Sequence, residues 1–137
     1  LLVEEETPDG LRLNQPAGHL DPGESLPQAV AREALEETAC RVEPRALVGV
    51  YMTRFHRPAL GIDVSYLRFA FDCRLLAEEP GRALDAGIVR TLWLSPDELR
   101  AAGDRHRSPL VMRTVDDWLA GRRFPLELIH TDPSCLR

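Results

Sequence analysis

Alternating apolar and polar residues mark the strands of this chain. The alternation is clearest between residues 64 and 75, where period two predicts a half-buried strand. Its apolar members are Leu67, Phe69, Phe71, Cys73 and Leu75, and the residues between them are Arg68, Ala70, Asp72 and Arg74.

Four further strands are expected, at 1–6, 11–14, 45–53 and 88–94. Pro8, Asp9 and Gly10 supply turn chemistry between the first two, which predicts a hairpin. Gly49 predicts a bulge in the strand at 45–53.

Three helices are predicted from their start and stop signals. Ser25 with Gln28 has the spacing of a capping box and predicts a helix over 26–38. Ser95 with Glu98 repeats that spacing before a short helix at 96–102. A third helix, at 109–119, is expected between a Ser108 cap and a stop at Gly121. Two tryptophans, Trp93 and Trp118, fall in core-like patterns and are expected to pack inside.

The order of these elements is strands, helix, strands, short helix, helix, which predicts an α/β fold with a mixed sheet between helices. At 137 residues the chain is expected to be one domain spanning 1–137. The segments at 15–24 and 76–87 have the composition of loops.

Charge and cysteine content narrow the classes of function. The net charge is −5 and all 17 basic residues are arginines, which argues against a nucleic-acid partner but leaves room for a small phosphorylated ligand. The three cysteines, Cys40, Cys73 and Cys135, suggest neither a disulfide framework nor a zinc site, and they fit a reducing, cytoplasmic compartment. No apolar run has the length of a membrane span, so no membrane partner is expected.

Three glutamates crowd the end of the helix at 26–38. At about 100° per residue, Glu33, Glu36 and Glu37 fall on one arc that borders the apolar arc of the helix. One interpretation is a solvated face on which Arg32 pairs with Glu36. The other is a site for Mg²⁺ or Mn²⁺, which prefer oxygen ligands and relieve the repulsion. In that case the carbonyl oxygen of Gly18 is a further candidate ligand, and Glu24 either assists or simply favours the helix dipole.

The segment "GHLDPGESLPQAVAREALEET" resembles the Nudix box, whose pattern is G-x5-E-x7-R-E-U-x-E-E-x-G-U with U a bulky apolar residue. Its fixed glycine and polar positions are filled by Gly18, Glu24, Arg32, Glu33, Glu36 and Glu37. The departures are Ala39 at the second glycine, Cys40 at the last apolar position and Ala34 at the first. "NQPAGHL", "YLRF", "RSPL" and "GRRFPLELI" are similar to the NudJ-type branch, phosphatases of nucleoside tri- and diphosphates and of hydroxymethylpyrimidine pyrophosphate.

The resemblance implies a Nudix fold, an α/β/α sandwich, with the first strand of the family absent from this chain. It also implies that Gly18, Glu33, Glu36 and Glu37 hold Mg²⁺, with Mn²⁺ as a substitute, that Arg32 fixes the cluster and that Glu24 supports it. Water then attacks phosphorus. Members of the family are commonly dimers, so a homodimer is one alternative.

The general base and the substrate contacts stay open. Glu33 and Glu36 are the nearest candidates for the base, and Glu78, Glu79 and Asp85 form an acidic loop that offers another. Arg68 is the first candidate for a phosphate contact, and Arg54, His56, Arg57 and Gln15 are weaker ones. The alternatives to a NudJ-type enzyme are a Nudix pyrophosphatase for ADP-ribose or a dinucleoside polyphosphate, and a module that binds nucleotides without catalysis.

Overall fold

The structure is a computed structural model that describes all residues from 1 to 137, and its strands form two separate antiparallel sheets. The first sheet has the order β2-β1-β5, and the second is the hairpin β3-β4. The bounds are β1 (Leu2–Thr7), β2 (Gly10–Asn14), β3 (Cys40–Arg57), β4 (Ile62–Glu78) and β5 (Ile88–Leu92). The prediction of one mixed sheet was therefore wrong, because periodicity shows which face of a strand is buried but not which strands pair.

The β3–β4 hairpin is longer than predicted at both ends. Its register runs from the pair Cys40–Glu78 to the pair Arg57–Ile62, with two bulges in β3 and one in β4. The bulges shift the alternation, so the pattern at 45–53 marks only the middle of the strand. One of the register shifts lies between Leu47 and Gly49, which confirms the predicted bulge.

The three helices are α1 (Leu26–Thr38), α2 (Pro96–Ala101) and α3 (Leu110–Leu119), and short 3₁₀ turns occur at η1 (Gly103–Arg105), η2 (Leu126–Leu128) and η3 (Pro133–Cys135). Both predicted capping boxes are confirmed, at Ser25 with Gln28 and at Ser95 with Glu98. At α3 the cap position is Pro109, one residue later than predicted, and Ser108 Oγ accepts the backbone N–H of Leu110 at 3.2 Å.

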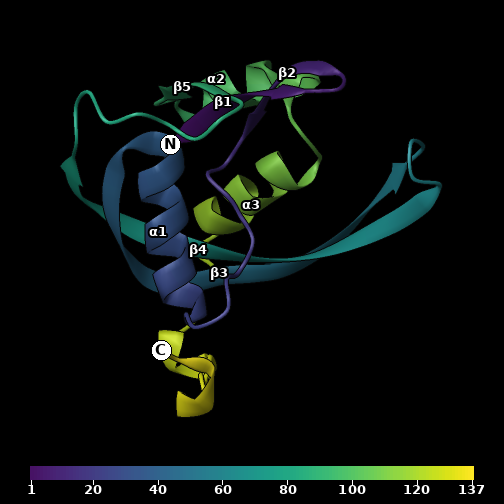
Figure 1. The fold of residues 1–137 in the computed structure, drawn as a ribbon. Helices are drawn as coiled ribbons and strands as arrows, with labels where there is room; N and C mark the ends of the chain where they lie inside the picture. Colours follow the sequence, from purple (N-terminus) through teal and green to yellow (C-terminus); the bar gives the residue numbers. More distant parts are fainter.

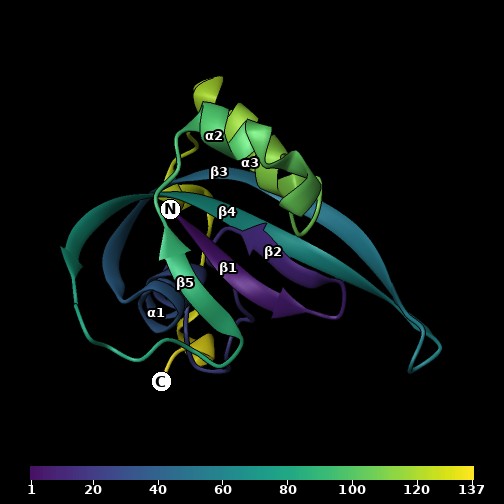
Figure 2. The same ribbon diagram turned by 90° about the horizontal axis from the view of Figure 1, so that it is seen from above.

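The strands lie between α1 on one side and α2 with α3 on the other (Figure 2). The core cluster is formed by Leu2, Leu13, Leu99 and Val111, so it joins the first sheet to α2 and α3. Both tryptophans lie on the surface, contrary to prediction, and Trp118 donates its indole N–H to Asp72 at 2.9 Å. None of the helices is both long and apolar enough to span a membrane.

The far half of the β3–β4 hairpin extends away from the rest of the molecule (Figure 1). Here the exposure of the two faces is the reverse of the sequence prediction. Leu67 is 61% exposed, whereas its neighbour Arg68 is half-buried. The polar and aromatic face of the hairpin is thus turned toward α1 and the loop before it, and the apolar face is turned outward.

Candidate functional site

Arg32 is the central cation of a carboxylate cluster on α1. Its Nη1 donates to Glu33 at 2.7 Å and to Glu36 at 3.0 Å. Its other nitrogens donate to Glu24 at 3.0 and 2.7 Å. The hydrogen bond with Glu24 is the main cause of the raised pKa of Arg32, and it also lowers the pKa of Glu24. Arg32 therefore holds three carboxylates in fixed positions.

The loop before α1 lies directly against this cluster. The carbonyl oxygen of His19 accepts a hydrogen bond from Arg32 Nη2 at 2.9 Å. The carboxylate of Glu33 lies so close to Gly18 that a Cβ built on this glycine would be 1.9 Å from Glu33 Cδ. Only glycine allows the Glu33 carboxylate to occupy this place.

Glu37 is the buried member of the cluster. It is 9% exposed, and its Oε2 accepts the backbone N–H of Ala17 at 3.1 Å. Burial raises the pKa of Glu37 to about 7, and the negative charges of Glu33, Glu5 and Asp85 act in the same direction. The charge around Glu37 is thus unbalanced by the protein alone, which is the condition that a bound cation relieves.

Asp85 reaches the cluster from the loop between β4 and β5. Its backbone N–H donates to the carbonyl oxygen of Glu36 at 3.0 Å, which ties this loop to α1. Carboxylate oxygens of Glu33, Glu36 and Asp85 lie within 4.8 Å of one another. Of the three acids proposed in this loop, the structure brings only Asp85 to the helix.

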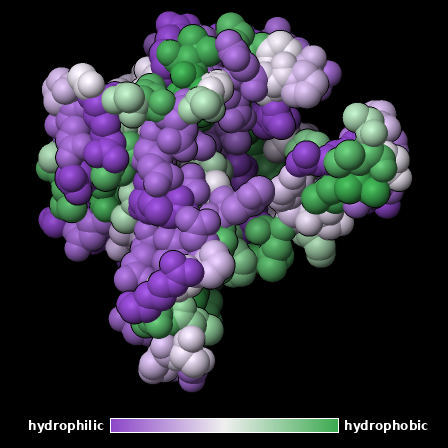
Figure 3. Space-filling model, in the orientation of Figure 1, coloured by the Kyte–Doolittle hydropathy of each residue, from purple (hydrophilic) through white to green (hydrophobic).

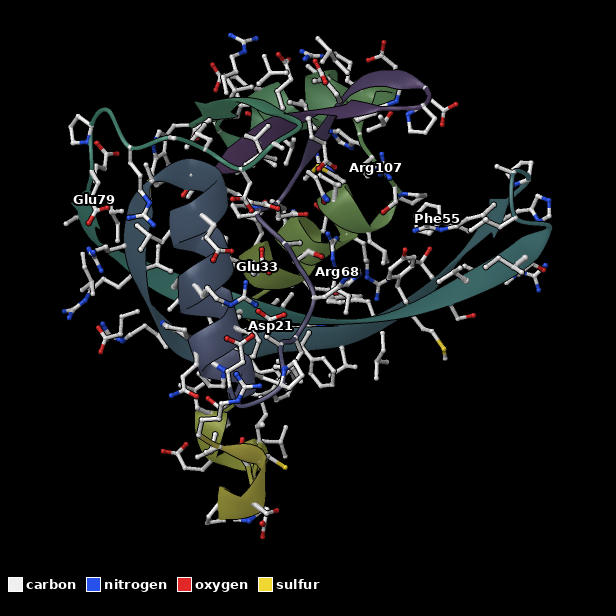
Figure 4. The ribbon with its side chains drawn as sticks, viewed as in Figure 1. Asp21, Glu33, Phe55, Arg68, Glu79 and Arg107 are labelled. Atoms are coloured by element: carbon white, nitrogen blue, oxygen red, sulfur yellow. The ribbon has the colours of Figure 1, made fainter.

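The other two acids lie elsewhere. Glu79 pairs with Arg41 at 2.6 Å and with Arg82 at 3.0 Å, and Glu78 is exposed at the end of β4. Figure 4 shows Glu79 at the end of the hairpin away from Phe55.

Arg68 lies on the face of the hairpin that is turned toward α1. Its Nη2 donates to Asn14 Oδ1 at 2.8 Å, and it forms no ion pair. Burial lowers its pKa, and the charge of Glu5 partly offsets the effect. A half-buried guanidinium without a carboxylate partner is suited to bind a phosphate.

The sequence interpretation missed three residues around Arg68. Glu5 on β1 accepts from Asn14 Nδ2 at 3.4 Å and lies 3.9 Å from Arg107 Nε, in the loop before α3. The backbone N–H of Arg107 donates to the carbonyl oxygen of Leu13 at 2.8 Å, which brings the loop before α3 to β2. The available signal for Glu5 was the run of three glutamates in β1. Successive strand residues point to opposite faces, so Glu5 lies on the face opposite to that of its two neighbours. Asn14 and Arg107 begin two of the segments quoted for their resemblance, "NQPAGHL" and "RSPL", but neither residue was singled out as a contact.

The weaker candidates for substrate contact have other partners. Gln15 Nε2 donates to the Val111 carbonyl at 2.7 Å, and its Oε1 is buried without a partner. Arg54 and His56 both pair with Asp63, at 3.3 and 2.8 Å, on the outward face of the hairpin. Arg57 donates to the Tyr66 hydroxyl. These contacts neither require nor exclude a ligand, so the roles of Arg54 and Gln15 stay predictions.

The donor set of the cluster has the chemistry of a site for a hard divalent cation. It consists of carboxylate oxygens, which Mg²⁺ and Mn²⁺ prefer, and it contains no sulfur or imidazole ligand. Arg68 adds a positive group nearby. The arrangement is suited to hold a phosphorylated molecule and to stabilise negative charge on it.

Known proteins share this architecture. Residues 1–115 match the NUDIX domain. Phosphatase NudJ of Escherichia coli strain K12 is 38% identical over 129 residues, which are 93% of this chain and 80% of that protein, and phosphatase NudJ of Shigella flexneri gives the same values. A solved NUDIX hydrolase from Nitrosomonas europaea matches with a TM-score of 0.84 at 46% identity, over 96% of this chain and 87% of that one.

Proposed function

This chain belongs to the Nudix hydrolase family, whose members act on phosphoanhydride bonds, and on that premise we propose that it is a Mg²⁺-dependent enzyme of the NudJ type. Its substrate is a nucleoside tri- or diphosphate or hydroxymethylpyrimidine pyrophosphate, which is cleaved by attack of water at phosphorus. The observation that carries the proposal is the approach of Glu33, Glu36 and Asp85 within 4.8 Å beside an arginine without a carboxylate partner.

In this proposal Glu33, Glu36, Glu37 and the carbonyl of Gly18 hold Mg²⁺, for which Mn²⁺ can substitute. When bound, the ion supplies Lewis-acid stabilisation of charge on phosphate oxygens and lowers the pKa of water. Arg32 and Glu24 act as positioning residues, because their hydrogen bonds fix the carboxylates of Glu33 and Glu36.

We propose that a carboxylate of the cluster accepts the proton of the attacking water. Glu33 and Glu36 are the first candidates, and Asp85 is the alternative, since the loop that carries it is fastened to α1. Arg68 binds a phosphate oxygen of the substrate. Gln15 and Arg54 are retained as weaker candidates, which would have to leave Val111 and Asp63 respectively.

The partner in solution is proposed to be a second copy of this chain. Val50, Met52 and Leu67 are 50, 71 and 61% exposed on the outward face of the hairpin, where no segment of this chain covers them. Arg54 and Asp63 flank this apolar centre and pair with each other at 3.3 Å, so two copies related by a two-fold axis would bring together apolar centres with charge-balanced rims.

A screen of nucleotides and pyrophosphate esters with Mg²⁺ tests the proposed reaction. Orthophosphate and pyrophosphate are measured separately, which identifies the bond that is cleaved. Turnover of nucleoside triphosphates or of the pyrimidine pyrophosphate supports the proposal. Cleavage of ADP-ribose to AMP without activity on triphosphates would point to a different Nudix pyrophosphatase, and absence of any turnover would point to a binding module.

Glu36→Gln tests the role of the cluster in the same screen. The amide removes one negative charge at similar size, so turnover should fall by about 100-fold or more. Glu127→Gln is the matched control, because Glu127 is exposed in η2 and forms no hydrogen bond or ion pair. Equal turnover by the two variants would contradict the assignment of the cluster.

A further inference from the structure

The inward face of the protruding hairpin carries aromatic residues beside Arg68. Thr53 pairs with Tyr66 across the strands, and Phe55 pairs with Val64. Since residues two apart in a strand share a face, Tyr66 lies on the same face as Arg68, about 7 Å farther toward the tip. These inward residues are half-buried, whereas their neighbours Met52 and Leu67 are exposed.

Tyr66 is the centre of a small aromatic group. The ring of Phe55 meets it edge to face, with 5.7 Å between the ring centroids. The ring of His19 is nearly parallel to it, at 9° and 6.2 Å. The group joins two elements that are far apart in sequence, the hairpin and the loop before α1.

His19 connects this aromatic group to the carboxylate cluster. It follows Gly18, against which Glu33 lies, and its carbonyl oxygen accepts a hydrogen bond from Arg32. His19 therefore contacts the carboxylate cluster with its main chain and Tyr66 with its ring.

The chemistry changes along the hairpin in one direction. Figure 4 shows Glu33, Arg68 and Phe55 in that order from α1 toward the tip, and Figure 3 shows a hollow between the main body and the protruding end. Carboxylates come first, then a guanidinium, then aromatic rings. A molecule with phosphates at one end and a flat ring at the other has the same order of groups.

We propose that the ring of the substrate, a nucleobase or a pyrimidine, stacks on Tyr66 and meets Phe55 edge to face, while its phosphates extend past Arg68 to the carboxylate cluster. The inference rests on the proposed function and adds a place for the part of the substrate that does not react. Stacking on aromatic side chains is sequence-tolerant, because every base has a π-face. The subsite therefore accepts several bases.

The Tyr66 hydroxyl has a separate role. It accepts a hydrogen bond from Arg57 Nη2, which holds the ring in place from the edge. The ring face, not the hydroxyl, is what the substrate contacts. Tyr66→Phe should therefore recover most of what Tyr66→Ala loses.

Steady-state kinetics of the full chain test the subsite with two probes. The first is the best ring-bearing substrate of the Mg²⁺ screen, and the second is inorganic tripolyphosphate, which has no ring and is used as a competitive inhibitor. In Tyr66→Ala the KM for the ring-bearing substrate should rise about 5- to 100-fold, the range that base–aromatic stacking supplies. The Ki of tripolyphosphate should stay within about twofold of wild type, because stacking contributes nothing to its binding.

Two further variants keep the test decisive. Tyr66→Leu retains apolar bulk if the alanine variant is unstable, and it should show the same split between KM and Ki. Trp93→Ala removes another exposed aromatic ring, beside Cys40 and Glu78 at the opposite end of the hairpin, and should change neither value.

The outcomes separate the inference from the proposed function. An unchanged KM in Tyr66→Ala and Tyr66→Leu, or a parallel rise in KM and Ki, would overturn the ring subsite and leave the hydrolase activity standing. No Mg²⁺-dependent turnover of any ring-bearing substrate by wild type would overturn the proposed function and the subsite with it.

Discussion

At position 18 the absence of a side chain decides where a carboxylate lies. A Cβ there would overlap Glu33, so Gly18→Ala should displace this carboxylate and lower kcat by about 100-fold, the cost of a misplacement near 1 Å. Stability should change little, because Gly18 is exposed and does not have a positive φ. Gly103→Ala is the matched control, since nothing lies within 4 Å of its added Cβ. Activity is measured under Mg²⁺ saturation, and equal kcat in both variants would count against the role of Glu33.

Glu37 should report the metal through stability. A ligand at about 100 times its Kd adds about 2.7 kcal/mol to the native state, so saturating Mg²⁺ should raise Tm by several degrees. Glu37→Gln should blunt the rise, because it removes a proposed ligand, and Glu127→Gln should keep it. The measurement is thermal unfolding at pH 7.5 with EDTA or with MgCl₂. The metal assignment would not survive a wild-type Tm that is the same in both buffers.

The residues of the candidate site divide by how near they lie in sequence. Those between Gly18 and Glu37 could be predicted, because one helix and the loop before it fix their spacing. Asp85 was proposed only as one of three acids, and nothing in its loop distinguished it from Glu79. Glu5 and Asn14 lie on the two strands of the predicted hairpin, whose register the local pattern does not fix, and Arg107 comes from a distant loop.

The end of α1 carries a strained residue. Ala39 has φ 58°, and it is the only residue other than glycine with a positive φ. A left-handed conformation costs an L-residue about 1–2 kcal/mol. Glycine avoids this cost, but its greater conformational entropy in the unfolded chain offsets part of the gain. Ala39→Gly should therefore raise the free energy of unfolding by about 0.5–1 kcal/mol.

The same substitution inside the helix should have the opposite sign. Ala31 lies in the middle of α1, so Ala31→Gly should lower the free energy of unfolding by about 1 kcal/mol. Urea unfolding of both variants provides the measurement. Destabilisation by Ala39→Gly would show that the backbone at this cap is not strained.

Elements with local signals were predicted well, and elements defined by pairing were not. The capping boxes of α1 and α2 are formed by residues three apart, so the sequence contains the whole motif. The length of the β3–β4 hairpin depends on bulges that keep two strands in contact after their alternation is lost. The sheet division follows from β1, which pairs with β2 and β5 and leaves the hairpin as a separate ribbon.

A buried carboxylate joins three of these elements and makes stability depend on pH. Glu4 on β1 is 4% exposed, and it accepts hydrogen bonds from Arg90 on β5, at 3.1 Å, and from Arg105 in η1. The bond from Arg90 is the main cause that holds the pKa of Glu4 below its ordinary 4.5. The contribution of the Glu4 charge to the free energy of unfolding is therefore fully present above pH 4.5, and it is lost as the pH falls through the folded-state pKa of Glu4.

Glu4→Gln should lower the free energy of unfolding by about 1.5–3 kcal/mol at pH 7, since it weakens charge-assisted hydrogen bonds. The difference from wild type should shrink below pH 4.5, where Glu4 itself becomes protonated. Denaturant unfolding at pH 7, 5 and 3.5 measures this. Glu6→Gln is the control, because Glu6 is exposed on the same strand. A constant difference across the three values would contradict the role of the Glu4 charge.

At the scale of the whole molecule, the protruding hairpin has two faces with different uses. The inward face carries Arg68 and the aromatic group, and its residues contact Asn14 at the end of β2 and His19 in the loop before α1. The outward face carries apolar residues that this chain leaves open. A two-stranded ribbon is marginally stable on its own in water, so a partner on the outward face would also hold the substrate face in place.

Removal of the outward apolar contact should therefore change both assembly and activity. Met52→Lys places a charge at the centre of a two-fold contact, where it meets the same charge of the second copy. Light scattering should give twice the 15.4 kDa chain mass for wild type and a single chain mass for Met52→Lys. Leu128→Lys, at a comparably exposed apolar residue in η2, should remain dimeric. Because the released hairpin is more mobile, Met52→Lys should also raise the KM for the ring-bearing substrate, and a monomeric wild type would remove the basis for both effects.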